Sequence, residues 1–127
     1  MYVFPGIGLG AILSKAVSVT QDMIYASAES LSTALNKQEV ADGWLYPDIR
    51  RIREVSVVVT RGVIRAAQQN GVDRATELRD LSDEQLDAHI KSKMYDPFAE
   101  RFPQAAKSDT NGFVNGVKEI VNSVAHL

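Results

Sequence analysis

The chain has 127 residues, of which 45% are apolar and 24% are charged, and its formal net charge is −2. This balance is ordinary for a folded domain and argues against intrinsic disorder, and the slight acidity gives no basic footprint for nucleic acid. The absence of cysteine excludes disulfides, thiolate catalysis and cysteine-based metal sites. No apolar run reaches the roughly 18 residues that span a bilayer, so we expect no membrane partner.

The first residues predict a short strand followed by a helix. Residues 2–4 combine aromatic and β-branched side chains, which suit a pleated strand, and Pro5 suits the start of a helix. The following helix is mostly apolar as far as Val17, and its Gly8 and Gly10 would permit close packing. This start has no basic segment and is interrupted by proline and glycine, so it does not match a signal peptide. We expect a protein that is not secreted.

A second helix is predicted from Thr20, which is a suitable N-cap, with Asp22 in the first turn. Residues 38–42 predict a single short turn, which Gly43 ends. The apolar stripe of this second helix recurs at steps of four, three and four residues, at Ile24, Ala28, Leu31 and Leu35.

The longest predicted helix begins around Pro47 and stops at Gly71. One face carries Ile49, Ile52, Val55, Val59, Val63 and Ala66. Further valines lie off that face, so the helix should be buried on more than one side. Residues 55–60 also have strong β propensity, which leaves a strand as the rival interpretation; the length of the segment and its flanking arginines favour the helix.

Ser82 followed by Gln85 is a capping-box pattern that predicts a fourth helix, ending before Pro97. Asp87 and Lys91 are spaced for an ion pair on that helix. Its narrow apolar stripe consists of Leu86, Ile90 and Met94. We therefore expect a mostly α fold with about five helices and one short N-terminal strand.

Residues 98–111 have the composition of a linker, and an amphipathic helix is predicted at the end of the chain. Its apolar side consists of Phe113, Val117, Ile120, Val124 and Leu127. The sequence thus divides into a main part, residues 1–97, and a linker with a C-terminal helix, residues 98–127.

Residues 6–11 match the pattern G-x-G-x-x-A of dinucleotide-binding loops. That loop needs a βαβ unit, with an acidic residue at the end of a second strand about 20 residues further on. Here that distance falls inside the second predicted helix. Close packing of the glycine segment is therefore the favoured interpretation, and a pyrophosphate loop is the alternative.

The remaining polar residues form no recognisable catalytic or metal constellation. His89 has no typical metal ligand one helical turn away, and Asp83 and Asp87 share a helix face that is too polar for an acid–base pair. Tyr2 and Lys15, the one plausible proton-transfer pair, are separated by most of the first helix. His126 carries still less signal. Arg50, Arg51 and Arg53 cluster beside Asp48 and Glu54 and are interpreted as a solvated helix face rather than a phosphate site.

Four blocks of the sequence, together covering roughly residues 1–97, resemble malic enzymes in order and spacing. They are Tyr2-Val3-Phe4-Pro5-Gly6-Ile7-Gly8-Leu9-Gly10-Ala11, the helix with Thr20, Asp22, Met23, Ala26, Ala28 and Leu31, the stretch Leu45-Tyr46-Pro47 with Ile52-Arg53-Glu54-Val55-Ser56, and Met94-Tyr95-Asp96-Pro97. Residues 104–127 match no part of the family pattern.

The resemblance implies the C-terminal part of the NAD-binding domain, the end of a Rossmann-like α/β domain, as a helical cover that supports the active-site cleft. Malic enzymes oxidise and decarboxylate malate to pyruvate with NAD or NADP and a divalent metal, Mg or Mn. The family's catalytic, metal-binding and main dinucleotide residues, and two substrate-binding asparagines, would precede Met1. We therefore assign no catalytic, cofactor-binding or metal residue to this chain, and expect no cofactor on the isolated chain.

The resemblance also implies a location in the cytoplasm or the mitochondrial matrix, and as partner the rest of a malic enzyme or a homo-oligomer. The alternative is an autonomous helical interaction module or a subunit of a split enzyme.

Overall fold

The computed structural model describes residues 1–96 of the chain, and these residues are helical with no strand among them. The mostly α fold class is confirmed. The predicted linker and the C-terminal helix, including His126, lie outside the described residues. The elements are α1 (Phe4–Leu13), α2 (Gln21–Thr33), α3 (Lys37–Ala41), the 3-10 turn η1 (Ile49–Arg51), α4 (Ile52–Gln69), the 3-10 turn η2 (Thr76–Leu78) and α5 (Asp83–Lys93).

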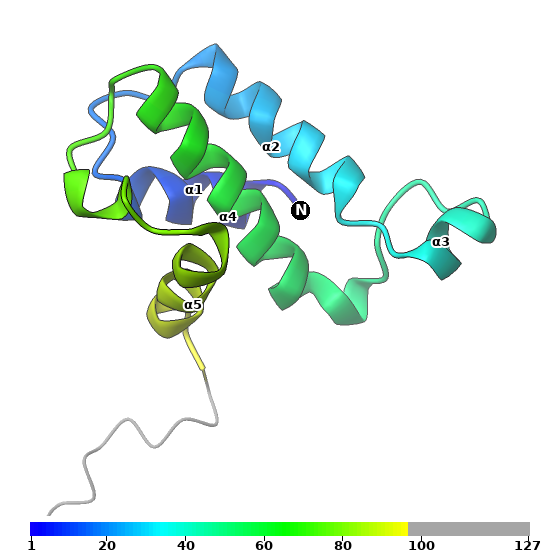
Figure 1. Ribbon diagram of the computed structural model, residues 1–127. Helices are drawn as coiled ribbons and strands as arrows, with labels where there is room; N and C mark the ends of the chain where they lie inside the picture. Colours follow the sequence, from blue (N-terminus) through cyan, green and yellow to red (C-terminus); the bar gives the residue numbers. More distant parts are fainter. Residues whose placement is uncertain (97–127) are drawn as a thin grey trace, which may run out of the picture. The chain divides into compact units, whose positions relative to one another are not determined.

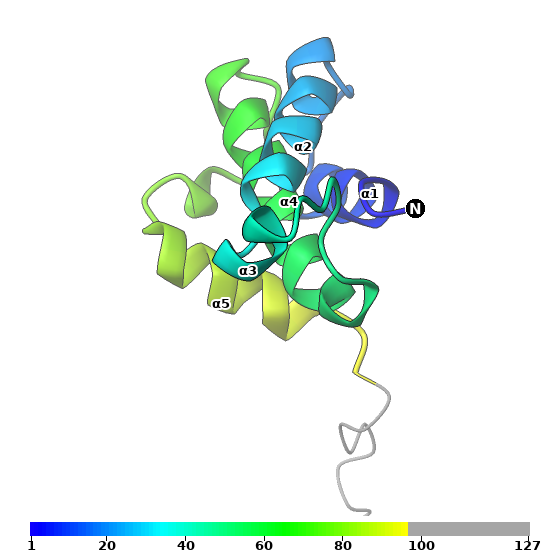
Figure 2. The ribbon, with the colours of Figure 1, turned by 90° about the vertical axis from the view of Figure 1, so that its right-hand side faces the viewer.

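Helix α4 is the centre of a compact unit, Met1–Met94, and α1, α2 and α5 all pack against it (Figure 1). Figure 2 shows α1 and α5 on different sides of α4. A helix in this position must be apolar on two faces, and α4 is. One buried cluster joins α4 to α2, with α1 beside it, and consists of Met23, Ala34, Val55, Val59, Val63, Ala66 and Ala67. The other lies towards α5 and consists of Val57, Ile64, Ala75, Leu78, Leu86 and Ile90.

These two clusters explain why residues 55–60 are helical in spite of their β propensity. A period of 3.6 residues sends Val55 and Val59 to one cluster and Val57 to the other. The predicted helix and its burial on two sides are confirmed, and the strand interpretation is wrong. The helix proper begins at Ile52, after η1, and Gly71 beyond its end has a φ of +67°, which suits glycine as the predicted stop.

The predicted strand at residues 2–4 is not confirmed, because α1 begins at Phe4 and Val3 is its N-cap. Val3 has helical backbone angles and its carbonyl accepts the N–H of Ile7 at 3.0 Å. Tyr2 and Val3 pack on the α1–α2–α4 cluster, and this packing outweighs a β propensity carried by only three residues.

The glycines of α1 divide between its two sides. A Cβ on Gly6 would overlap Val59, and one on Gly10 would lie 2.7 Å from Cγ1 of Val63, so both glycines permit close contact with α4. A Cβ on Gly8 would have no neighbour within 4 Å in the described part of the chain. The predicted close packing is therefore confirmed for Gly10, whereas Gly8 has no close neighbour within residues 1–96.

Helix α2 begins as predicted, since the Thr20 hydroxyl accepts the backbone N–H of Met23 at 3.3 Å. Its predicted apolar stripe is confirmed only in part: Leu31 packs on the cluster and Leu35 is half-buried, but Ile24 and Ala28 are exposed. The buried residues of α2 are Met23 and Ser27. The buried side needs small side chains, since α2 approaches α4 closely where Gly62 meets Ser30.

Helix α5 has the predicted capping box, in which the side chains and backbone N–H groups of Ser82 and Gln85 bond reciprocally at 3.3 and 3.0 Å. Leu86 and Ile90 are fully buried, as the stripe predicts. Asp87, however, pairs with Arg61 of α4 at 2.7 Å rather than with Lys91. No helix within residues 1–96 has both the length and the apolar character to cross a membrane.

Candidate functional site

The residues considered for proton transfer lie apart. The Tyr2 ring stacks on Tyr46, with centroids 5.9 Å apart and planes 6° from parallel, whereas Lys15 pairs with Glu77 at 3.8 Å. Asp83 and Asp87 each pair with an arginine of α4, at 3.0 and 2.7 Å.

The match to a dinucleotide-binding loop does not have the required structure. All three glycines lie inside α1 rather than in a loop before it, and Gly6 and Gly10 face the valines of α4. A pyrophosphate needs free backbone N–H groups at the start of a helix, with space in front of them. The close-packing interpretation is supported, with a neighbouring helix in place of the strand.

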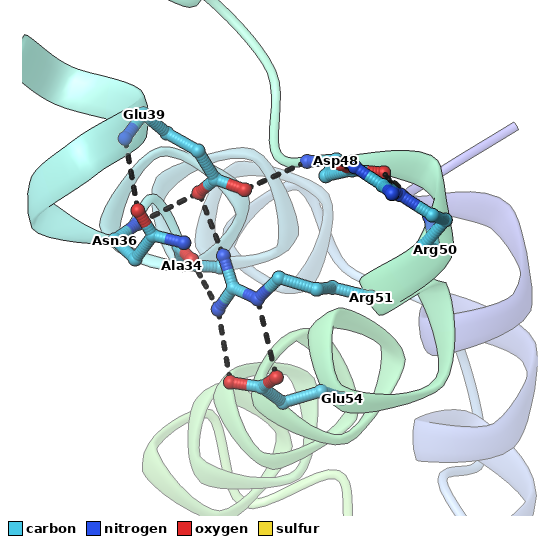
Figure 3. Close-up of polar contacts among 7 residues, drawn as sticks. All are labelled: Ala34, Asn36, Glu39, Asp48, Arg50, Arg51 and Glu54. Carbon is cyan, nitrogen blue, oxygen red and sulfur yellow. Dashed lines mark hydrogen bonds and ion pairs between the residues drawn. The ribbon is translucent and has the colours of Figure 1, made fainter. Parts of the chain in front are cut away.

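A polar cluster that was not predicted centres on Glu39 and Arg51. Glu39 lies on the short helix α3 and is only 5% exposed. Its carboxylate accepts the backbone N–H groups of Asn36 and Asp48 at 2.7 and 2.8 Å and Nη1 of Arg51 at 2.6 Å (Figure 3). Arg51 in turn donates two bonds to Glu54 and one, at 3.2 Å, to the carbonyl of Ala34.

These bonds shift the ionisation of both groups. The backbone N–H of Asp48 is the main cause that holds the pKa of Glu39 below its usual value, and burial opposes it. The pKa of Arg51 is raised, chiefly by Glu54 and then by Glu39. Both groups therefore stay charged at neutral pH, and the expectation of a solvated arginine face is wrong for Arg51.

Asp48 forms the adjoining cap. One of its oxygens accepts the backbone N–H of Arg50 at 2.8 Å, and the Arg50 guanidinium bonds the same carboxylate. The Arg50 side chain lowers the pKa of Asp48 to about 2. The Glu39 carboxylate and this cap both hold the Asp48 end of residues 43–48, which connect α3 to η1. At the other end, the backbone N–H of Trp44 donates to the carbonyl of Glu39 at 2.9 Å.

Two hollows flank this connection. The polar one, of about 260 Å³, lies over the Glu39–Arg51 cluster. The other, of about 400 Å³, is open and more apolar, and is lined by Tyr2, Trp44, Leu45, Tyr46, Pro47, Asp48 and Ile49. Trp44, Leu45 and Tyr46 are exposed. The polar groups of the Glu39–Arg51 cluster bond one another, and we call this cluster the clamp. It adjoins the segment that carries the exposed side chains of Trp44, Leu45 and Tyr46.

The described residues do not fit a divalent metal. No group of three or more His, Cys, Asp or Glu side chains comes together in residues 1–96. Two of the carboxylates, Glu39 and Glu54, share the guanidinium of Arg51, which already supplies a positive charge to both.

Part of the clamp has a local sequence signal. Asn36 followed three residues later by Glu39 is a capping-box pattern, and the structure shows both of its reciprocal bonds. The contact of Glu39 with Arg51 has no local signal, because the two residues are twelve positions apart.

Comparison with known proteins identifies the domain to which these helices correspond. A family model described as "Malic enzyme, NAD binding domain" matches residues 1–68. The chain belongs to the malic enzyme family. The match is to the NAD-binding domain of the family, and within residues 1–96 the chain contributes helices alone.

Several malic enzymes from plants are similar to this chain. The mitochondrial NAD-dependent malic enzyme of Amaranthus hypochondriacus is 37% identical over 103 residues, which cover 76% of this chain and 16% of that protein. The mitochondrial 59 kDa isoform of the NAD-dependent enzyme of Solanum tuberosum is 38% identical over 103 residues, covering 76% of this chain and 17% of that protein. An NADP-dependent malic enzyme of Populus trichocarpa is 38% identical over 96 residues, covering 76% and 16%. The chain thus matches about a sixth of the length of these relatives.

Proposed function

We propose that this chain forms the C-terminal helical part of the NAD-binding domain of a malic enzyme, and that it is inactive in isolation. The whole enzyme would decarboxylate malate oxidatively to pyruvate with NAD or NADP. The observation that carries this proposal is the match of residues 1–68 to the NAD-binding domain of the family. Relatives named for each nucleotide resemble the chain to the same degree, so the choice between NAD and NADP stays open.

The role of the chain in that enzyme would be to support the cleft rather than to perform the chemistry. Tyr2, at the start of the matched region, is held by its stack on Tyr46, and Tyr46 belongs to the connection fixed by the Glu39–Arg51 clamp. Through these contacts the chain would position whatever precedes α1. The nucleotide, the substrate and a divalent metal would be bound by residues outside this chain.

The partner in this proposal is the rest of a malic enzyme, with a homo-oligomer as the alternative. A mitochondrial location is supported by the names of two NAD-dependent relatives, and a cytoplasmic one is the alternative. An autonomous interaction module has no specific observation in its favour.

The test of isolated inactivity uses the purified 127-residue chain with malate, NAD or NADP, and manganese. We expect no reduction of the nucleotide above a protein-free blank. As the positive arm, the chain replaces the matched 103-residue segment of the Amaranthus hypochondriacus enzyme. Malate-dependent reduction by this chimera supports the proposal, whereas turnover by the isolated chain contradicts the claim of inactivity.

A further inference from the structure

The side of α1 that faces away from α4 is apolar and uncovered in the described part of the chain. Phe4 and Ile12 are 80% and 73% exposed, and Gly8 lies between them at the same helical spacing of four residues. The first charged side chain of the sequence is Lys15, so α1 itself carries no charged side chain that would favour contact with water over contact with a partner. A helix that is apolar all round is normally buried all round.

Gly8 makes this side more specific than an exposed apolar patch. A glycine inside a helix is unfavourable by about 1 kcal/mol relative to alanine. Gly6 and Gly10 compensate for this cost by letting α4 approach, but Gly8 has no contact that a Cβ would disturb in residues 1–96. A glycine flanked by two large exposed side chains permits close approach of a second backbone. That backbone would approach at Gly8 and pack between the side chains of Phe4 and Ile12.

We propose that the stripe Phe4–Gly8–Ile12 is the docking face for the rest of the NAD-binding domain, whether that part is on the same polypeptide or on another. This inference rests on the proposed function. The choice of occupant comes from the comparisons, since the chain matches an NAD-binding domain but covers about a sixth of its relatives' length. Most of the partner surface therefore belongs to sequence that these 127 residues do not contain.

The decisive variant is Gly8→Leu, and it is compared in two settings. Within residues 1–96 a Cβ on Gly8 meets no neighbour within 4 Å, so we expect the melting temperature of the isolated chain not to fall. In the Amaranthus hypochondriacus chimera the same side chain would lie between two packed backbones, and overpacking is destabilising. We expect the chimera to lose several degrees of melting temperature together with most of its malate-dependent NAD reduction.

Ala28→Leu is the matched control, because Ala28 is exposed on α2 and receives the same side chain away from the stripe. It should leave the chimera unchanged. If Gly8→Leu is as harmless in the chimera as Ala28→Leu, the inference is overturned and the proposed function stands. If the unmodified chimera does not assemble, the proposed function fails and the inference falls with it. If the isolated chain forms dimers that Gly8→Leu abolishes, the occupant is a second copy and our assignment is wrong.

Discussion

Replacing each of two glycines of α1 by alanine should change stability in opposite directions. At Gly8 the new methyl group meets nothing within 4 Å in residues 1–96, so we expect the variant to gain helix propensity alone, about 0.5–1 kcal/mol. At Gly10 the same gain applies, but the methyl carbon would lie 2.7 Å from Cγ1 and 2.8 Å from Cβ of the fully buried Val63.

Gly10→Ala should be destabilising because the atoms around the new methyl group cannot move away from it. The carbonyl of Thr60 would also lie 3.2 Å from the new carbon, and backbone cannot rotate away as a side chain can. Overpacking of this kind costs about 1–3 kcal/mol. Because the propensity gain is common to both variants, it cancels in their difference, and Gly8→Ala should exceed Gly10→Ala in stability by about that overpacking cost.

Urea denaturation of the 127-residue chain, followed by circular dichroism, measures this difference. For a domain of this size 1 kcal/mol corresponds to about 4–8 °C in melting temperature, so thermal melts provide an independent check. Sedimentation at the same concentration shows whether both variants are in the same association state. If Gly10→Ala equals or exceeds Gly8→Ala in stability, then α1 does not lie against α4 as described.

Three further outcomes follow from the contacts. Folding lowers the pKa of Glu39 below its ordinary 4.5. The charged Glu39 therefore contributes to stability above pH 4.5, and this contribution is lost as the pH falls through the folded pKa. In denaturation melts, Glu39→Gln should be less stable than the unmodified chain at neutral pH, and this difference should shrink below about pH 4.5. Arg61→Ala should cost about 1–3 kcal/mol in urea denaturation, because it leaves Asp87 unpaired, and adding Asp87→Ala should recover part of that loss. Tyr46→Leu should cost about 0.5–1.5 kcal/mol through the lost stack on Tyr2, whereas Tyr46→Phe, which keeps a ring, should cost less; equal costs would mean that the stack does not contribute.

Local signals in the sequence were sufficient where the structure is decided locally. The caps at Thr20 and Ser82 form because a side-chain oxygen meets a backbone N–H three residues further on, whatever surrounds the helix. The two-sided burial of α4 was likewise readable, since its valines repeat at helical spacing on two faces. The strand at residues 2–4 failed because a β propensity of three residues yields to the packing of Tyr2 and Val3.

The buried side of α2 could not be deduced from hydropathy. Its contact with α4 is set by how closely the backbones approach at Gly62, and this approach requires small side chains such as Ser30. A buried serine is tolerated because its hydroxyl bonds within the helix, as Ser27 does to the Ile24 carbonyl at 2.5 Å. Ile24 is larger and more apolar, yet it faces outwards.

The Glu39–Arg51 clamp shows how a misassigned charge cluster changes the functional interpretation. In sequence, Arg51 lies beside Glu54, and a local pair of this kind is typical of a solvated helix face. In the structure a third group, Glu39, reaches Arg51 from α3 and at the same time accepts the backbone N–H of Asp48. Arg51 thereby joins a network in which Glu39 also holds Asp48, at the end of the segment whose Tyr46 ring stacks on Tyr2. Local sequence patterns do not predict this network, because its central contact joins residues twelve positions apart.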